Sequence, residues 1–376
     1  MTLLFLSNYF NHHQKPFSDA MYRRLGDGYR FVETEAMSDE RKKLGWGNIE
    51  RPSYVLTRNE DNKDEIQALI DSANAVIIGS APDFLIRHRL KQNKLIFRYA
   101  ERPDKQSPPL WKFLARQLVW RKRYPARKPM YMLCASAYTA SDYARYGCFR
   151  GKCFKWGYFP ETKRYADLQA LVDRKKPASI LWTARFIDWK HPEIAVEVAK
   201  RLRRDGYVFE LNMIGNGVML ESIRAQIEQD RLTDCVHLLG SMTPEQVREH
   251  MERSEIFLFT SDRNEGWGAV LNESMNSACA VIADDAIGSV PFLIEEGKNG
   301  LTYQTGDIDG IVQKVKYLLD HTAERQAMGR EAYRTITEEW NAEVAAERLI
   351  EATQYKDKII FWNDSKSGLL SIIKQR

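Results

Sequence analysis

The sequence predicts an α/β protein of two Rossmann-like, doubly wound domains that face a cleft, and two observations carry this prediction. Short apolar runs alternate with helical patterns throughout the chain, as they do in parallel sheets built from βαβ units. The length of 376 residues is that of about two such domains. Because open sheets of this kind bind ligands at the carboxyl ends of their strands, we expect functional residues in the loops that follow the strands.

The first domain is expected over residues 1–165, where five apolar runs predict strands. These runs cover residues 2–7, 30–34, 75–78, 95–99 and 130–135. Two helix faces lie between them. One precedes the third strand and is formed by Ile66, Leu69, Ile70 and Ala73, and the other precedes the fifth strand and is formed by Leu110, Phe113, Leu114 and Leu118.

The second domain is expected over residues 166–340. Its predicted strands are residues 179–183, 210–214, 236–239, 256–259, 280–283 and 300–303. Its predicted helices are residues 191–204, 220–230, 244–253, 270–277 and 309–320, and in the first of these Ile194, Val198 and Leu202 form one stripe. Residues 341–376 are expected to form a helical tail, for which packing back on the first domain is one arrangement.

Composition is that of a globular protein, with 44% apolar and 28% charged residues. No apolar run approaches the roughly 18 residues of a transmembrane helix, and the apolar start of the chain is read as a first strand rather than a signal peptide. Five scattered cysteines predict a reduced, cytoplasmic protein. Cys148 and Cys153 have the spacing of neither a zinc site nor a redox pair, so no metal site is expected there.

Basic residues concentrate between residues 86 and 128, where fourteen Lys and Arg side chains face only Glu101 and Asp104. Helix 110–123 in this segment combines Trp111 and Trp120 with a basic cluster at residues 121–123. Such a surface suits peripheral contact with an anionic membrane, whereas the alternative is a core-packed helix with a solvated basic face. Nucleic acid is not expected as a partner, because the segment contains no recognised nucleic-acid module.

Glu265 and Glu273 form the most informative motif, an E-x7-E spacing between a buried strand and a helix. Gly266 and Gly268 expose backbone N–H groups just before the helix, where anions bind readily. A carboxylate on either side can accept hydrogen bonds from sugar hydroxyls. The motif therefore suits a sugar joined to a diphosphate, although two glutamates at this spacing also occur by chance.

Further strand-to-loop segments extend the pattern. Arg185 and Lys190 follow the strand at residues 179–183 and are expected to converge on a diphosphate, the arginine by a bidentate fork. The alternative, two solvated cations, is disfavoured because cations are poorly placed at the N-terminus of a helix. Glycine turns follow at Gly215-Asn216-Gly217, Leu239-Gly240-Ser241 and Gly288.

In this order, residues 179–320 closely resemble the nucleotide-sugar domain of retaining GT-B glycosyltransferases with the E-x7-E signature, of the family 4 type that builds capsules and exopolysaccharides. The resemblance extends over nearly the whole chain and implies a donor of the UDP-sugar or GDP-sugar type and no cofactor. It implies that Arg185 and Lys190 hold the diphosphate and that Glu265 meets the transferred sugar beside Gly266, Trp267 and Gly268. It also implies donor contacts from Gly215, phosphate contacts from Ala269, Val270 and Leu271, ribose contacts from Glu273, and base contacts from Ser241 and Met242.

The implied reaction retains the anomeric configuration and needs no metal. The departing diphosphate is expected to deprotonate the acceptor, while Arg185, Lys190 and the helix terminus stabilise the leaving group. Asp284, Asp285, Asp307 and Asp309 superficially resemble metal ligands and are read as turn acids. Trp267 stands where phenylalanine is more usual in relatives, which is expected to reshape the sugar pocket.

The loop after the first strand contains Asn11-His12-His13 followed by Pro16-Phe17. This loop departs from the glycine-rich loop of many relatives and resembles that of a capsule and exopolysaccharide subgroup. His12 or His13 is expected to orient the acceptor or contact the donor sugar, with loop stiffening as the alternative. No histidine follows the strand at residues 95–99, where many relatives have one, so Glu101 and Arg102 are the candidates there.

The sequence thus predicts a cytoplasmic, retaining, metal-independent glycosyltransferase that transfers sugar to a saccharide or lipid-linked saccharide in surface polysaccharide biosynthesis. Peripheral association with the inner face of the plasma membrane is part of this prediction. Two alternatives remain open: a sugar-nucleotide epimerase on a similar fold, and a noncatalytic sugar-nucleotide-binding partner subunit.

Overall fold

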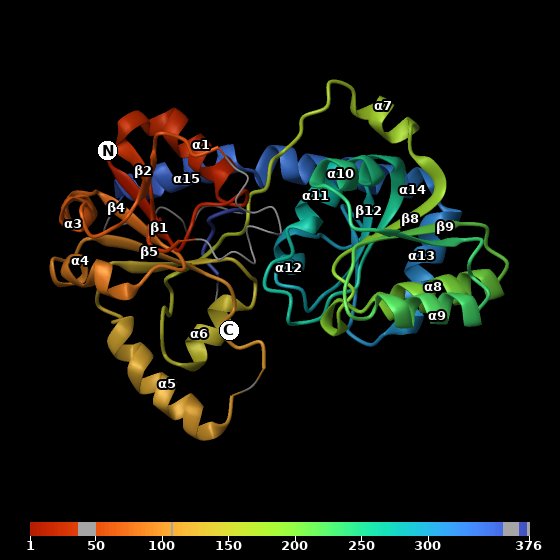
Figure 1. Cartoon of the computed structure of the whole chain (residues 1–376), viewed down its shortest axis with the longest axis horizontal. Helices are drawn as coiled ribbons and strands as arrows, with labels where there is room; N and C mark the ends of the chain where they lie inside the picture. Colours follow the sequence, from red (N-terminus) through yellow and green to blue (C-terminus); the bar gives the residue numbers. More distant parts are fainter. Residues whose placement is uncertain (37–49, 107, 356–367, 374–376) are drawn as a thin grey trace. The chain divides into compact units, whose positions relative to one another are not determined.

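The computed structural model describes residues 1–36, 50–106, 108–355 and 368–373, and the chain divides into two compact units (Figure 1). Unit 1 comprises Met1–Glu161 and Asn341–Arg376, and unit 2 comprises Thr162–Trp340. The predicted division lay four residues later, after residue 165. Among the described residues, no helix is both long and apolar enough to cross a membrane.

Unit 1 contains one parallel sheet, with seven strands in the described residues and the order β3-β2-β1-β4-β5-β6-β7. The strands are β1 (Leu3–Ser7), β2 (Tyr29–Glu33), β3 (Val55–Thr57), β4 (Ala75–Ile78), β5 (Leu95–Ala100), β6 (Met130–Cys134) and β7 (Cys153–Lys155). The five predicted strands are present within one residue at each end. The short edge strands β3 and β7 were missed, because three residues are too few to show a pattern.

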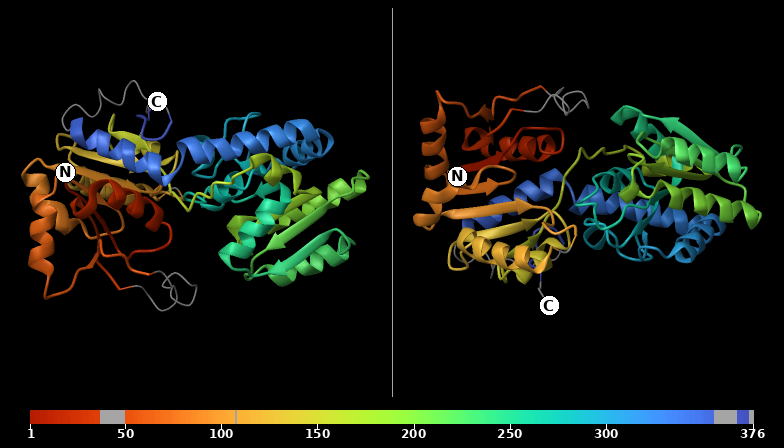
Figure 2. Two further views of the ribbon diagram at one scale, coloured as in Figure 1. Left: turned by 90° about the horizontal axis from the view of Figure 1, so that it is seen from above. Right: turned by 60° about the horizontal axis from the view of Figure 1, so that its bottom comes forward.

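The α-helices described for unit 1 are α1 (Lys15–Leu25), α3 (Lys63–Ser72), α4 (Arg87–Lys91), α5 (Leu110–Arg123), α6 (Thr139–Arg145) and α15 (Ala342–Tyr355). Helix α15 belongs to the predicted tail and packs against α1, where Arg23 and Arg24 both pair with Glu343 (Figure 2). Further along the tail, Ile372 forms an isolated antiparallel bridge with Phe154 of β7. The tail therefore lies on unit 1; its residues 356–367 and 374–376 are outside the described part.

Unit 2 contains a second parallel sheet, with six strands in the described residues and the order β10-β9-β8-β11-β12-β13. The strands are β8 (Lys176–Thr183), β9 (Glu210–Ile214), β10 (Val236–Gly240), β11 (Ser254–Phe259), β12 (Ala280–Asp284) and β13 (Leu301–Tyr303). The α-helices described are α7 (Leu168–Asp173), α8 (Pro192–Arg204), α9 (Leu220–Gln229), α10 (Pro244–Arg253), α11 (Val270–Asn276), α12 (Val290–Leu293), α13 (Ile308–Asp320) and α14 (Thr322–Arg334).

The core of unit 2 follows the predicted periodicity. Ile194, Val198 and Leu202 of α8 are all buried, which confirms the stripe expected from their spacing. Thr243 begins α10 with a capping box, in which its hydroxyl accepts from Gln246 N and the Gln246 side chain accepts from Thr243 N. Asp307 likewise caps α13, because its carboxylate accepts from Gly310 N at 2.8 Å. This contact agrees with the prediction that Asp307 is a turn acid.

Helix α5 differs from its prediction. Of the four residues of the expected core face, Leu110, Leu114 and Leu118 are 73%, 50% and 68% exposed, and only Phe113 packs inward. The helix packs through Phe113 and Trp120, whose rings lie 4.7 Å from Tyr146 and 4.9 Å from Tyr143. The prediction was wrong for the three leucines because α5 has apolar residues on two sides, and the aromatic partners at α6 select one of them.

Lys175 is a buried cation that joins two helix ends to the start of β8. Its ammonium donates to the carbonyls of Met251 at 3.2 Å, Ser254 at 2.7 Å and Ser277 at 2.8 Å. Helix C-termini leave carbonyls without intrahelical partners, so this one side chain satisfies groups that end α10 and follow α11. Burial lowers the pKa of Lys175.

Replacement of Lys175 by methionine should destabilise unit 2 by about 2 to 4 kcal/mol, because three buried carbonyls lose a charged donor, although that of Met251 keeps a backbone donor, Ser254 N. The measurement is urea unfolding followed by tryptophan fluorescence. Lys176→Met is the matched control, since the neighbouring ammonium pairs with Glu210 at the surface and its side chain is 59% exposed. Equal midpoints for the two variants would contradict the assigned role of Lys175.

Asp284 ends β12 with a buried carboxyl group. Its Oδ1 accepts from Ala286 N and from Thr305 Oγ1, both at 2.8 Å. This carboxyl closes the turn after β12, as a turn acid does. The two hydrogen bonds lower the pKa of Asp284, but the effect of burial is larger and raises this pKa from 3.8 to about 6.

Because its pKa is raised in the folded protein, the ionisation of Asp284 lowers the free energy of unfolding as the pH rises. Below pH 3.8 the carboxyl is protonated in both the folded and the unfolded chain, whereas above pH 6 the folded chain contains a buried charge. Asp284→Asn keeps an acceptor oxygen for both hydrogen bonds and should be more stable than the wild type above pH 6, by at most about 3 kcal/mol. Urea midpoints measured between pH 4 and 8 test this, and a gain that is independent of pH would exclude the carboxyl as its source.

Candidate active site

The predicted site in unit 2 lies where the order of the sheet reverses. Strands β9 and β10 extend from one side of β8, and β12 and β13 extend from the other side of its neighbour β11. At such a switch point the loops after the two central strands leave in opposite directions and open a crevice for ligands. Arg185 and Lys190 follow β8, and Glu265 follows β11, so the fold brings these parts of the prediction together.

Lys190 and Glu265 form a direct ion pair between their side chains. Each side chain is only 12% exposed, so the pair is largely removed from water. The sequence predicted both residues for the site but assigned one to phosphate and the other to sugar. The structure shows that the two side chains also contact each other, so that the cation of one is balanced by the anion of the other.

Trp189 organises the two cations and was not predicted as a site residue. The Lys190 ammonium lies 4.3 Å from the centre of its ring, and the Arg185 guanidinium carbon lies 5.6 Å from it. Both distances are in the range of cation–π attraction. The sequence signal was available, because an aromatic residue between two predicted phosphate ligands is well placed to contact both.

The backbone of this loop is tied to β11 by Thr260. The Thr260 hydroxyl donates to Lys190 O at 2.7 Å and accepts from Trp182 Nε1 at 2.8 Å. Asp262 N adds a hydrogen bond to Trp189 O at 3.0 Å. These contacts hold the Lys190 side chain beside the loop that carries Glu265.

The glycine turn after β9 serves close packing. A Cβ atom on Gly215 would lie 1.9 Å from Ala184 O, and one on Gly217 would lie 2.3 Å from Phe186 O. The N–H of Gly215 donates to Gly240 O at 2.8 Å, so this group is already used inside the protein. Gly215, predicted as a donor-binding residue, therefore acts first by allowing the loops after β8 and β9 to approach each other.

The turn from Gly266 to Leu271 is tightly packed. Gly268 has a φ of +85°, and a Cβ atom there would lie 2.4 Å from the ring of Phe259. Trp267 is 1% exposed, and its indole donates to Asn272 Oδ1 at 2.9 Å, so its side chain belongs to the interior of unit 2 rather than to an open sugar pocket. Leu271 N already donates to Gly268 O at 3.0 Å, which leaves Ala269 and Val270 as the partly exposed members of the predicted phosphate turn.

Glu273 lies in the first turn of α11 and is partly buried. Burial raises the pKa of its carboxyl group, and the nearby Arg248 opposes this rise. Arg248 donates to the backbone oxygen of Glu273 at 3.1 Å, and among the described residues none donates to its carboxylate. The carboxylate is thus available to accept hydroxyl groups. Ser241 and Met242, the predicted base contacts, follow the end of β10.

In unit 1 the predicted histidines belong to an aromatic cluster at the carboxyl ends of the strands. His12 and His13 have ring centres 3.9 Å apart, and His13 stacks on Tyr158 at 5.6 Å. The Tyr158 hydroxyl donates to Glu101 Oε1, which brings the predicted Glu101 into the same cluster. Tyr158 was not predicted. Burial, together with the neighbouring His12, lowers the pKa of His13 to about 3, so its imidazole is neutral near pH 7.

Phe10 N anchors the histidine loop by donating to the buried carboxylate of Glu33 at 2.8 Å. Arg102, the other candidate after β5, has a structural role. Its guanidinium pairs with Asp142 at 3.2 Å, and the two side chains are 7% and 8% exposed. Arg102 is therefore committed to holding α6 and does not join the His13–Tyr158–Glu101 cluster.

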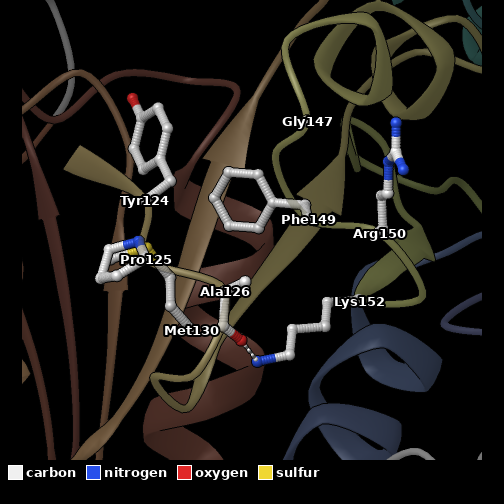
Figure 3. A pocket seen from close by; sticks show the side chains of 8 residues that line it. All are labelled: Tyr124, Pro125, Ala126, Met130, Gly147, Phe149, Arg150 and Lys152. Atoms are coloured by element: carbon white, nitrogen blue, oxygen red, sulfur yellow. Dashed lines mark hydrogen bonds between the residues drawn. The ribbon is translucent and has the colours of Figure 1, made fainter. Parts of the chain in front are cut away.

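A small hollow in unit 1 lies away from these loops. It measures about 90 Å³ and is lined by Tyr124, Pro125, Ala126, Met130, Gly147, Phe149, Arg150 and Lys152 (Figure 3). Met130 begins β6, so the hollow lies at the amino end of that strand, and it is too small for a nucleotide. Within the described residues, no three His, Cys, Asp or Glu side chains are grouped to hold a metal ion.

Part of the chain resembles sequences of a known family. The family described as "Glycosyl transferases group 1" matches residues 164–335. The amylovoran biosynthesis glycosyltransferase AmsK of Erwinia amylovora is 27% identical over 181 residues, which are 47% of this chain and 44% of AmsK. The putative colanic acid biosynthesis glycosyltransferase WcaL of Salmonella typhimurium is 23% identical over 47% of this chain and 45% of WcaL. The chain thus spans less than half the length of these relatives.

Solved structures match the fold over almost the whole chain. The structure of Anabaena Alr3699/HepE in complex with UDP matches with a TM-score of 0.67 at 14% identity. This match covers 94% of this chain and 100% of the HepE chain. The lipopolysaccharide outer core galactosyltransferase WaaB in its apo form has a TM-score of 0.65 at 16% identity and covers 96% and 99%. The match to the glycosyl transferases group 1 family thus covers residues 164–335, which carry the Lys190–Glu265 pair and Glu273, and the chain as a whole has the GT-B fold.

Proposed function

We propose that the chain is a retaining glycosyltransferase that moves a sugar from a nucleoside diphosphate sugar to an acceptor saccharide without a metal ion. The observation that carries this proposal is the Lys190–Glu265 pair at the switch point of the unit 2 sheet. It joins a cation suited to phosphate and a carboxylate suited to sugar hydroxyls at the place where open sheets bind nucleotides. The family of residues 164–335 supports this assignment.

The donor would occupy the loops after β8, β10 and β11. Arg185 and Lys190 would bind the diphosphate, with the ring of Trp189 holding both cations in place. Glu265, released from Lys190, would accept hydroxyls of the transferred sugar, and Glu273 would accept those of the ribose. The structure of HepE was solved with UDP, which makes UDP the first nucleotide to test and GDP the second.

The chemistry requires stabilisation of a leaving group. As the bond between sugar and phosphate breaks, negative charge develops on the departing diphosphate, and preorganised cations lower the energy of that state. A phosphate oxygen on the same face would take the proton of the acceptor hydroxyl, so the sugar keeps its anomeric configuration. Glu265 positions the sugar in this scheme and does not act as the base.

The acceptor would be a saccharide or a lipid-linked saccharide of a surface polysaccharide. The names of AmsK and WcaL, which refer to amylovoran and colanic acid, support this class. His12, His13, Tyr158 and Glu101 of unit 1 are proposed to contact the acceptor, because their rings and carboxylate suit a sugar face and its hydroxyls. The five cysteines are buried and form no disulfide, which supports a reducing compartment such as the cytoplasm.

Glu265→Gln should lower the rate of transfer by a factor of about 100 to 1,000, because the amide loses the charge that meets both Lys190 and the sugar. Transfer of labelled sugar from UDP-sugars and GDP-sugars to a membrane extract measures this rate. Glu296→Gln is the control, since it removes a surface carboxylate that pairs with Lys314. Full activity of Glu265→Gln would refute the assignment, and conversion of the donor sugar without any acceptor would indicate an epimerase.

Lys190→Ala should weaken binding of UDP or GDP about 10-fold to 100-fold, because a hydrogen bond to a charged group is lost. Its affinity for the corresponding nucleoside, which has no phosphate, should not change. Glu273→Gln should instead weaken nucleotide and nucleoside by similar factors, since the ribose is common to both. Titration calorimetry measures all four affinities.

Lys200→Ala is the control for these titrations, because Lys200 is half exposed and pairs with Asp230 on the surface. Equal losses of nucleoside affinity in Lys190→Ala and Glu273→Gln would disprove the separate roles. Failure of the wild-type protein to bind either nucleotide would contradict the donor site as a whole.

A further inference from the structure

Helix α5 has two different faces, and only one of them contacts the rest of unit 1. On the inner face, Phe113 and Trp120 pack on Tyr146 and Tyr143, and the Arg116 guanidinium pairs with Asp104. The helix lies beside α6 at the edge of unit 1 (Figure 1). No residue of α5 is fully buried, so this contact covers one side of the helix alone.

The outer face of α5 is apolar. Trp111, Leu114 and Leu118 are 67%, 50% and 68% exposed, and their spacing of three and four residues places them on one side of the helix. Leu110 and Val119 extend the same surface, at 73% and 59% exposure. Five of the eleven large apolar side chains that are exposed in the described residues therefore lie on this one helix of fourteen residues. A contiguous patch of this kind usually marks an interaction site.

Basic residues border the apolar face. From Lys105 to Ser141 the sequence contains eight Lys and Arg residues and no Asp or Glu. Lys112 and Lys122 of α5 are exposed, and neither has an acidic partner among the described residues. The Lys112 ammonium lies 5.3 Å from the ring centre of Trp111, next to the apolar surface. The face thus combines apolar side chains with uncompensated positive charge.

We propose that the outer face of α5 docks on the surface of a lipid bilayer that contains anionic headgroups. Leucine and tryptophan side chains would enter the boundary between headgroups and acyl chains, while the lysines would reach the headgroup phosphates. A second copy of this chain fits less well, because two such faces would bring like charges together. The inference does not depend on the proposed transferase activity, since the helix, its exposure and its charge are features of unit 1 alone.

Cosedimentation of the full-length protein with vesicles tests this proposal. Vesicles of phosphatidylcholine are compared with vesicles of equal parts phosphatidylcholine and phosphatidylglycerol, at low and high salt. The wild type should sediment with the anionic vesicles, and less so at high salt because charges are screened. Leu114→Gln/Leu118→Gln should reduce binding at least about tenfold at both salt concentrations, since the inserted apolar groups are lost. Lys112→Gln/Lys122→Gln should reduce it by roughly fivefold per lysine at low salt only.

Val208→Gln/Val218→Gln is the matched control, because both valines are 90% exposed and lie in unit 2. This variant should bind vesicles as the wild type does. Sedimentation velocity without lipid completes the design: a dimer that Leu114→Gln/Leu118→Gln converts to a monomer would show that a second copy covers the face. That result would overturn the proposal, as would vesicle binding that the leucine substitutions leave unchanged.

Discussion

An ion pair between Lys190 and Glu265 joins the loops after the two central strands of unit 2, and much of the surrounding structure maintains it. Thr260 fixes the backbone of Lys190, and Gly215 and Gly217 let the neighbouring loop approach without a steric clash. A partly buried lysine and glutamate lose hydration, which their mutual attraction must offset. In the proposed function, a nucleoside diphosphate sugar would offer each of them a replacement partner, a phosphate for the cation and hydroxyls for the anion.

Much of this arrangement could be predicted from the sequence, because the relevant signals are local. Buried parallel strands are continuous apolar runs, and the loops that follow them carry the chemistry. The positions of Arg185, Lys190, Glu265 and Glu273 along the chain therefore predicted which strand ends carry the candidate site. The direct contact between Lys190 and Glu265 could not be predicted, because it depends on the sheet order that makes β8 and β11 neighbours. The burial of Trp267 and the pairing of Arg102 with Asp142 also depend on packing, which the sequence did not predict.

Helix α5 shows a different limit of sequence patterns. Its apolar residues fall on two sides, and periodicity gives no means of deciding which side meets the sheet. Tyr143 and Tyr146 decide it, by offering an aromatic surface to Phe113 and Trp120. The leucines then remain outside. A residue class that is normally read as core can thus become surface when a competing face has the better partners.

Lys175 also fixes the position of α10 relative to α11, in addition to stabilising unit 2. Its ammonium holds the C-terminal ends of α10 and α11 to each other, and Arg248 of α10 adds contacts to Glu273 O and Asn276 at 3.1 Å. The loop before α10 carries Met242, and α11 carries Glu273, so the proposed base and ribose contacts belong to helices with a shared anchor. The relative position of α10 and α11 is therefore fixed in the protein itself. Binding of a nucleotide would not need to restrict the motion of one helix against the other. Little conformational entropy should then be lost at the nucleoside end, and the adjustment on binding is left to the side chains around the diphosphate.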